Sequence, residues 1–208
     1  MSGGKVSFID SKGYPVIFMI LITMLFIGIL ATFYHATIDR ISIYQEISYR
    51  KALLDLFGLP QDNIEADYSN YIRKIVKDNI QYYEASRDSN LIGYAFEIKG
   101  NGLWGTITAL IAVNQDITRL LKIEILSQNE TPGLGGRITE KWFKNQFSNK
   151  LIWEDGALIQ FNLVPENEEI SDSQIRQITG ATSSSKAVVD MIFRNLQKIN
   201  EKMDLTND

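Results

Sequence analysis

An uncharged apolar run near the N-terminus most constrains how this chain can fold. From Pro15 to Phe33, nineteen residues carry no charge and are mostly Ile, Leu, Met, Phe and Val. As a helix rising about 1.5 Å per residue, the run spans roughly 28 Å, close to the thickness of a bilayer core. A core helix of this length would normally have a polar face, which this run lacks. Tyr14 and Tyr34 bracket it like an aromatic belt, so we expect a transmembrane helix over residues 15–34.

A cleaved signal peptide is the alternative interpretation of the same run. It is disfavoured because the run is long for a signal peptide and no clear Ala-x-Ala cleavage site follows it. Lys5 and Lys12 precede the run, whereas Arg40 is the one close cation after it. The positive-inside rule therefore predicts a cytoplasmic N-terminal tail over residues 1–14 and a body on the outer side of the membrane.

The composition excludes several classes of site. The chain has 208 residues, no cysteine and a single histidine, His35. Disulfides, Cys-ligated iron–sulfur clusters, zinc thiolate sites and Cys nucleophiles are therefore excluded, and so is a His-rich metal site. The formal net charge of −4 gives no indication of a nucleic-acid partner. We predict neither a metal site nor a catalytic residue.

The segment directly after the apolar run has a helical pattern. Ile38 to Phe57 predicts one helix, which a glycine and a proline close. Asp67 to Tyr83 predicts a second, with its Ile and Val side chains on one face. Tyr82 and Tyr83 either belong to the core, which is the safer interpretation, or edge a pocket. Residues 35–90 are therefore expected to form a helical membrane-proximal segment.

From residue 91 the pattern changes to strands. Three apolar runs rich in Ile and Val are separated by Gly, Asn and Asp, and they predict an antiparallel meander: Leu91 to Lys99, Thr106 to Asn114, and Leu120 to Gln128. A short helix over Lys141 to Phe147 and a further strand over Ala157 to Val164 follow. We therefore expect an α+β fold class, in which the membrane helix precedes one α+β domain with an antiparallel twisted sheet over residues 91–208.

The segment Thr179–Ser185 is short, small and rich in hydroxyls. Directly after it, apolar residues from Val188 onward recur at helical spacing, so the segment is expected at a helix N-terminus. Unpaired backbone N–H groups and the positive end of the helix dipole favour an anion there. Gly180 would let the backbone approach a ligand, and Thr182 would present a hydroxyl to it. A plain Ser/Thr N-cap is the alternative.

Two glycine-containing segments are further candidates. Glu130–Gly136 follows the third strand, and its Pro-Gly and Gly-Gly pairs mark a tight loop. Its main-chain N–H groups and the Thr131 hydroxyl could meet a polar ligand edge, or the loop is a plain turn. Its spacing matches neither the dinucleotide fingerprint nor the P-loop. In Gly100–Gly105, Trp104 stands between glycines, where it either packs in the core or covers a flat aromatic ligand.

Together these segments resemble the FMN-binding domain of one protein family. The family comprises the C subunit of the sodium-translocating NADH:quinone reductase (Nqr) and the homologous G subunit of the Rnf electron-transport complex. The matching residues are Gly102 to Trp104, Glu130 to Gly135 and Thr179 to Thr182, in the same order and behind a membrane anchor. The resemblance covers nearly the whole chain. The Gly-Leu-Trp element favours Nqr and the short chain favours Rnf.

The resemblance implies a covalent cofactor. In this family the last Thr of the Ser/Thr-Gly-Ala-Thr motif, here Thr182, carries FMN through a phosphoester bond, and a separate flavin transferase adds it from FAD. No local base accompanies Thr182, so self-attachment is not expected. The other residues that the resemblance implies at the flavin are Thr179, Gly180, Ala181, Ser183, Thr131, Leu134, Gly135 and Trp104.

The resemblance also implies a place and a role. The chain would be an electron-relay subunit on the outer face of the bacterial cytoplasmic membrane. Its partners would be the other subunits of a complex that moves sodium ions or protons, an oxidoreductase in which this chain is not an enzyme by itself. The isoalloxazine ring would carry out the redox chemistry.

One position departs from the family motif and keeps an alternative open. An acidic residue usually stands three positions before the first Thr or Ser, whereas this chain has Arg176. Arg176 could pair with a flavin phosphate or lie on the surface. Lys186, one turn into the helix, could likewise lie near the phosphate or be an exposed lysine. The alternative is a membrane-anchored assembly or ligand-binding domain without covalent flavin. A hydrolase with a nucleophile among Ser183–Ser185 is disfavoured, because no Gly-x-Ser-x-Gly elbow exists.

Overall fold

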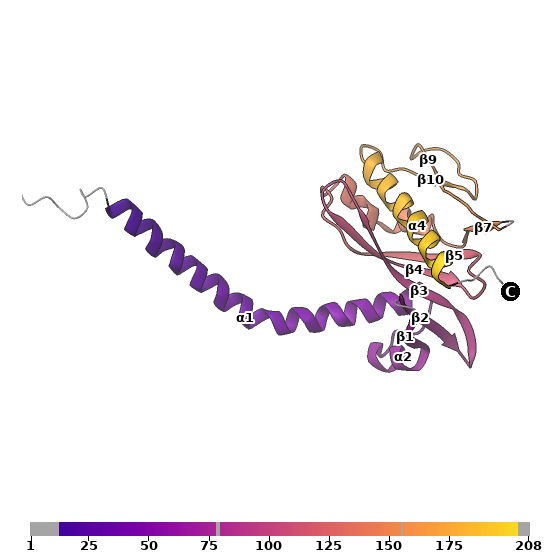
Figure 1. Ribbon diagram of the computed structural model, residues 1–208, viewed down its shortest axis with the longest axis horizontal. Helices are drawn as coiled ribbons and strands as arrows, with labels where there is room; N and C mark the ends of the chain where they lie inside the picture. Colours follow the sequence, from indigo (N-terminus) through magenta and orange to yellow (C-terminus); the bar gives the residue numbers. More distant parts are fainter. Residues whose placement is uncertain (1–12, 78–79, 155, 204–208) are drawn as a thin grey trace, which may run out of the picture. The chain divides into compact units, whose positions relative to one another are not determined.

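Figure 1 shows the computed structural model, which describes residues 13–77, 80–154 and 156–203. The chain divides into two units, Met1–Glu46 and Ile47–Asp208. The predicted cytoplasmic tail over residues 1–14 lies outside the described residues except for its last two positions.

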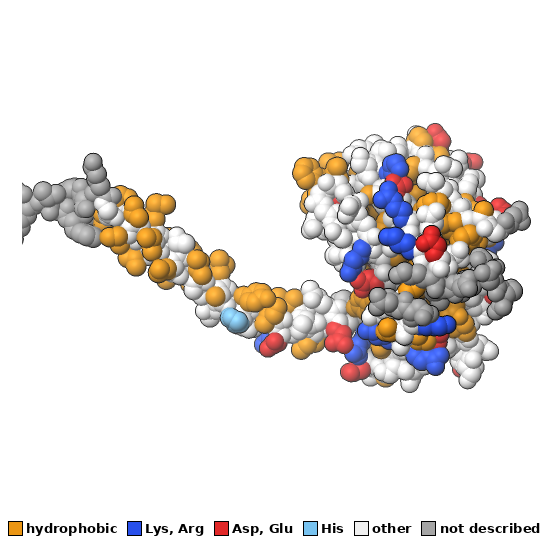
Figure 2. All heavy atoms as spheres, viewed as in Figure 1, with side chains coloured by type: hydrophobic (Ala, Val, Ile, Leu, Met, Phe, Trp, Pro, Cys, Tyr) orange, Lys and Arg blue, Asp and Glu red, His pale blue; other side chains and the backbone are white. Residues whose placement is uncertain are grey.

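The first unit consists of the apolar run and the turns of helix that follow it. Both belong to α1 (Tyr14–Leu56), and the most apolar part of the run has no side chain buried inside the structure. Figure 2 shows hydrophobic side chains along the visible face of this segment. The hydroxyl of Thr32 donates to the Gly28 carbonyl at 2.8 Å, so this polar side chain is satisfied within the helix. By length and composition, this is the one helix among the described residues that can cross a membrane.

The second unit is built on a six-stranded antiparallel sheet in the order β1-β2-β3-β4-β5-β6. Its strands are β1 (Ile72–Lys77), β2 (Ile80–Arg87), β3 (Asn90–Asn101), β4 (Thr106–Asn114), β5 (Arg119–Ser127) and β6 (Lys150–Leu151). The predicted meander is therefore confirmed in β3, β4 and β5. Neighbouring strands in the sheet are also neighbours in the chain until β6, which returns after α3.

Both faces of the sheet are covered, and strand β4 shows why. Its odd-numbered residues Ile107 to Val113 belong to one hydrophobic core, and its even-numbered Leu110 and Ala112 belong to the other. Helix α4 (Thr182–Met203) packs on the first face through Val188 and the apolar residues that follow it at helical spacing. The last turns of α1, with Leu53, Leu54 and Leu56, pack on the second face together with α2 (Ile64–Tyr71).

The predicted helix over Asp67 to Tyr83 is wrong beyond Tyr71. Residues 72–77 and 80–87 are β1 and β2, which pair with each other and continue the sheet from β3. The spacing of their Ile and Val residues suits a helix, and burial along β1 does not alternate, so the local pattern does not reveal the two strands. Tyr82 and Tyr83 are buried in opposite cores, which confirms that they are core residues. Pairing of β1 with β2, and of β2 with β3, overrides the local pattern in this segment.

The predicted strand over Ala157 to Val164 is broken into two short strands. β8 (Ala157–Leu158) pairs with β7 (Trp153–Glu154), and β9 (Asn162–Val164) pairs in parallel with β10 (Gln174–Arg176). Before them, the glycine loop after β5 enters a short 3-10 helix, η2 (Gly135–Thr139), followed by α3 (Lys141–Asn145). The short predicted helix is thus confirmed, with Phe143 and Phe147 fully buried.

Candidate functional site

The hydroxyl-rich segment forms the start of α4, as the sequence predicts. Gly180 takes a φ of +78°, which lets the chain turn into the helix. The buried hydroxyl of Ser185 accepts a hydrogen bond from the Ile178 N–H at 2.9 Å and donates to the Ala181 carbonyl at 3.1 Å. Ser185 thereby fixes the turn from inside, and Thr182 begins the helix with its side chain exposed.

The hydroxyls of Thr182 and Ser183 are free in the described part of the chain. Both side chains are exposed in the first turn of α4, and neither hydroxyl has a hydrogen-bond partner among the described residues. They lie where unpaired backbone N–H groups and the helix dipole favour an anion. Neither serves as a plain N-cap here, so both are available to a ligand.

Glu130 joins the three segments that the sequence singles out. Its side chain is only 4 % exposed. One carboxylate oxygen, Oε1, accepts the backbone N–H groups of Leu103 at 2.8 Å and Trp104 at 3.0 Å. The other, Oε2, accepts the hydroxyl of Ser184 from the first turn of α4. A single buried carboxylate therefore holds the Gly-Leu-Trp turn, the glycine loop and the helix start together.

Two of the glycines are needed for this close approach. A Cβ at Gly102 would collide with Glu130 Oε1, and a Cβ at Gly135 would collide with both Ser184 Oγ and the Glu130 side chain. Neither glycine has a positive φ, so space rather than backbone conformation selects glycine at both positions.

The three segments enclose a cleft of about 500 Å³. This is within the range of small-molecule sites, about 300–1,000 Å³. Its rim carries three exposed apolar side chains, Leu103, Trp104 and Leu134. Trp104 is 68 % exposed, which rules out the core position that the sequence left open for it. A cleft with an apolar rim and free hydroxyls at a helix N-terminus suits a ligand with a flat apolar part and an anionic part.

The structure brings together all of the predicted site residues except Thr179. The cleft is lined by Leu103, Trp104, Glu130, Thr131, Leu134, Gly135, Gly180, Ala181, Thr182, Ser183 and Ser184. Sequence reasoning missed the roles of Glu130 and Ser184. An acid at the head of a glycine loop was the available signal for Glu130, but its partners are remote in sequence.

Neither of the two candidate cations lines the cleft. Arg176 Nε donates to the Glu168 carbonyl at 2.6 Å, which holds the guanidinium on a surface loop. Lys186 pairs with Asp190 at 2.8 Å and is otherwise exposed. Among the described residues, no group of acidic or histidine side chains suited to a metal ion occurs either. An anion in the cleft would therefore meet N–H groups and hydroxyls.

Thr179 lies beside the cleft and binds an acid from another segment. Its N–H donates to Glu166 Oε2 at 2.7 Å, and Arg137 Nη2 contacts Glu166 Oε1 at 3.0 Å. The Thr179 N–H first, the Thr179 hydroxyl next and then the Arg137 guanidinium lower the pKa of Glu166 from 4.5 to about 2. The motif thus has a carboxylate next to its first threonine in space, although Arg176 occupies the usual acidic position in sequence.

This arrangement predicts a pH dependence of stability. A pKa that is lower in the folded state stabilises the fold above the unfolded value, and that contribution is lost as pH falls towards the folded value. We expect wild type to melt at a higher temperature than Glu166→Gln at neutral pH. The difference should shrink as pH falls from 4.5 towards about 2. Paired thermal melts across this range measure it, and a difference that stays constant with pH would contradict the assignment.

Comparison with known proteins decides what kind of domain this is. Residues 102–197, which contain the motifs Gly102–Trp104, Glu130–Gly135 and Thr179–Thr182, match the FMN-binding domain family. The chain carries an FMN-binding domain. The resemblance to the Nqr C and Rnf G subunits is confirmed by relatives with those names.

Two relatives show how far the similarity extends beyond the FMN-binding domain. The G subunit of an ion-translocating oxidoreductase complex from Methanosarcina acetivorans is 28% identical over 190 residues, which cover 88% of this chain and 93% of that protein. The C subunit of the Na⁺-translocating NADH-quinone reductase from Vibrio anguillarum is 32% identical over 140 residues, covering 67% of this chain and 54% of that protein. The similarity to the second relative thus covers about half of its length.

A solved structure supports the fold of the FMN-binding domain and the segments around it. The crystal structure of the C subunit of the Na⁺-translocating NADH-quinone reductase from Parabacteroides distasonis superimposes with a TM-score of 0.66. It is 24% identical in sequence, and the match covers 81% of this chain and 98% of that one. The predicted α+β fold with an antiparallel sheet is therefore confirmed.

Proposed function

We propose that this chain is the FMN-carrying electron-transfer subunit of a membrane-bound oxidoreductase complex of the Rnf/Nqr type. The FMN-binding domain and relatives that are subunits of such complexes support the proposal. The observation that carries it is the cleft in which Glu130 joins the three motif segments beside the free Thr182 hydroxyl. When bound, the isoalloxazine ring supplies the electron transfer.

Thr182 is the proposed attachment point of the flavin. Its hydroxyl lies in the cleft without a partner among the described residues, at a helix N-terminus that favours the remaining phosphate charge. A flavin transferase is the proposed partner during maturation, with FAD as donor. The Thr182 oxygen then forms a bond to the FMN phosphorus and the pyrophosphate bond of FAD breaks. AMP leaves, and the hydroxyl proton passes to a base of the transferase, because the carboxylate in the cleft, Glu130, is buried and already accepts hydrogen bonds from Leu103, Trp104 and Ser184.

The rest of the cleft fits the other parts of FMN. Leu103, Trp104 and Leu134 offer apolar surface for the ring system. Thr131, which is exposed in the glycine loop, offers a hydroxyl for the polar edges of FMN. Because Glu130 fixes these segments relative to one another, its role is to position the cleft walls rather than to react.

The proposed membrane helix determines where the subunit is located. α1 would anchor the chain in the bacterial cytoplasmic membrane with the N-terminus inside and the FMN-binding domain on the outer face. Anchoring raises the local concentration of the domain against neighbouring subunits of the complex, which are the proposed electron partners. The whole complex would couple the redox reaction to movement of sodium ions or protons.

The test measures flavin on the full-length protein. The chain is co-expressed with a flavin transferase, purified in detergent and run on a denaturing gel. We expect a fluorescent band at the mass of the chain and a mass increase equal to one FMN residue. Flavin that is present in the native protein but lost on denaturation would disprove the covalent bond and retain the site. A protein without flavin in either form would overturn the proposed function.

A further inference from the structure

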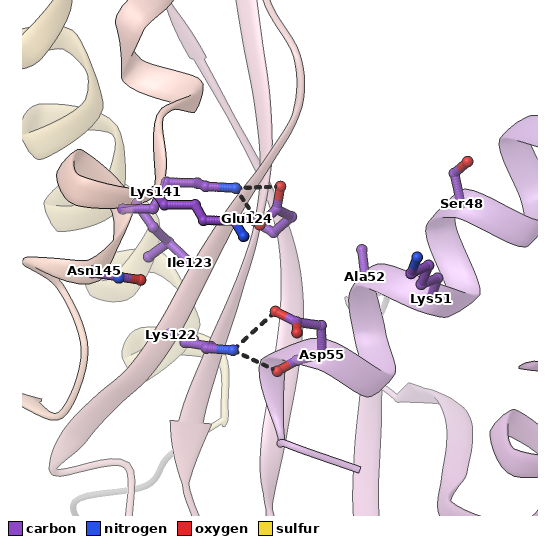
Figure 3. Close-up of a pocket in the computed structure, with 10 residues that line it drawn as sticks. Ser48, Lys51, Ala52, Asp55, Lys122, Ile123, Glu124, Lys141 and Asn145 are labelled. Atoms are coloured by element: carbon purple, nitrogen blue, oxygen red, sulfur yellow. Dashed lines mark hydrogen bonds and ion pairs between the residues drawn. The ribbon is translucent and has the colours of Figure 1, made fainter. Parts of the chain in front are cut away.

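A second hollow lies away from the FMN-binding cleft and shares no residue with it. It has a volume of about 550 Å³ and is bounded by the last turns of α1, strand β5 and helix α3. Figure 3 shows Ser48, Lys51 and Asp55 on its α1 side. Lys122 from β5 and Lys141 from α3 lie on the opposite side. All of these residues belong to the second unit of the chain.

Two of the four lysines in the hollow are held in place by carboxylates. Lys122 Nζ donates to both the backbone carbonyl and the Oδ2 of Asp55, each at 2.9 Å. Lys144 Nζ donates to both oxygens of Glu124, at 2.7 and 2.6 Å. An ammonium group has a further N–H beyond these two. Both lysines are therefore oriented in advance and can still donate to a ligand, which lowers the entropy lost on binding.

The other two lysines have no carboxylate partner in the part of the chain that the structure describes. Lys51 and Lys141 are exposed, and the side chain of neither forms an ion pair or hydrogen bond with any described residue. Four lysines thus face two carboxylates, Asp55 and Glu124, in one hollow. The chain as a whole is negative, with a formal charge of −4, so this hollow is of opposite sign to the protein. Uncompensated positive charge gathered in a concave site attracts an anion.

The donor set indicates which anion fits. Lysine binds phosphate as a point charge, whereas a planar carboxylate is best matched by the fork of an arginine. No arginine among the described residues lines the hollow, and Ser48 and Asn145 add a hydroxyl and an amide. The enclosed volume suits a small ligand or headgroup rather than the flat surface of a protein partner.

We propose that this hollow is a phosphate-binding site, with Lys51 and Lys141 as its principal ligand contacts and Lys122 and Lys144 as preoriented donors. The phosphate is carried either by an anionic phospholipid headgroup or by a small soluble phosphate ester. The site is separate from flavin binding and does not depend on it.

The test uses the full-length protein in an uncharged detergent. Glycerol phosphate and a short-chain phosphatidylglycerol are titrated separately, with binding followed by calorimetry. We expect saturable binding of at least one of these probes. Lys51→Gln/Lys141→Gln should weaken that binding by about tenfold or more, since it removes two charge-assisted hydrogen bonds. Added salt should weaken it in wild type as well.

Lys74→Gln/Lys77→Gln is the matched control, because both lysines are exposed on the edge strand β1 and the change in charge is identical. It should bind like wild type. Lys51→Gln alone should give an intermediate loss, which keeps the test valid if the double variant folds poorly. Binding of phosphatidylglycerol alone identifies a lipid headgroup, and binding of glycerol phosphate alone identifies a soluble ester. Failure of both probes to bind, or equal binding by the two double variants, would overturn the proposal.

Discussion

Thr182→Ala is expected to abolish covalent flavin completely while leaving the fold intact. The proposed phosphoester needs the Thr182 oxygen, and alanine has none. The fold should tolerate the change because the side chain is exposed and its hydroxyl has no partner in the described residues. Surface substitutions of this kind usually change stability by less than about 0.5 kcal/mol. In-gel fluorescence and intact mass measure the flavin, and circular dichroism measures the fold.

Neighbouring hydroxyls supply the controls for this variant. Ser183→Ala removes an equally exposed hydroxyl from the same helix turn and the same cleft, so it should retain the fluorescent band. Thr179→Ala should retain it too, because the contact of Thr179 with Glu166 through its backbone N–H survives the change. Fluorescence that persists in Thr182→Ala, or disappears equally in Ser183→Ala, would place the attachment elsewhere.

The sequence predicted the elements whose signals are local. The start of α4 was predicted because Gly180 and the hydroxyls lie directly before a long helical repeat. The meander was predicted because its three strands are β-branched runs separated by turn residues. The long apolar helix α1, a candidate membrane span, needed only length and the absence of charge. In each case the deciding interactions lie within the element or between neighbours in the chain.

The features that escaped prediction depend on which segments meet, and the pattern within each segment does not show this. The spacing of β1 and β2 predicts a helix, but they are strands because β1 pairs with β2 and β2 pairs with β3. Glu130 belongs to one of the motifs, but its hydrogen bond to Ser184 could not be predicted because Ser184 is 54 positions away on α4. Glu166, which accepts the Thr179 N–H, likewise lies 13 positions away from its partner. One sequence does not show which of its polar side chains meet.

Glu130→Ala is expected to give the largest loss of stability at the candidate site. It removes the acceptor for the N–H groups of Leu103 and Trp104 and for the hydroxyl of Ser184, which is only 2 % exposed. A buried donor left without an acceptor costs about 1–3 kcal/mol, and water can reach part of the Leu103–Trp104 turn. We therefore expect a total of about 3 kcal/mol, or a drop in melting temperature of about 10 °C.

Glu130→Ala should also reduce flavin incorporation, because the three segments that form the walls of the cleft are no longer held in a fixed arrangement. Glu130→Gln removes the negative charge but keeps the hydrogen bonds. Its amide oxygen can accept both backbone N–H groups, and its NH₂ can donate to the Ser184 oxygen. It should therefore keep most of the stability and of the flavin. Glu169→Ala, at an exposed carboxylate, is the control for losing an acid and should melt like wild type. Suppose that Glu130→Ala had the same melting temperature as Glu169→Ala and incorporated flavin fully. The three segments would then be held by their own packing, and the carboxylate would have no positioning role.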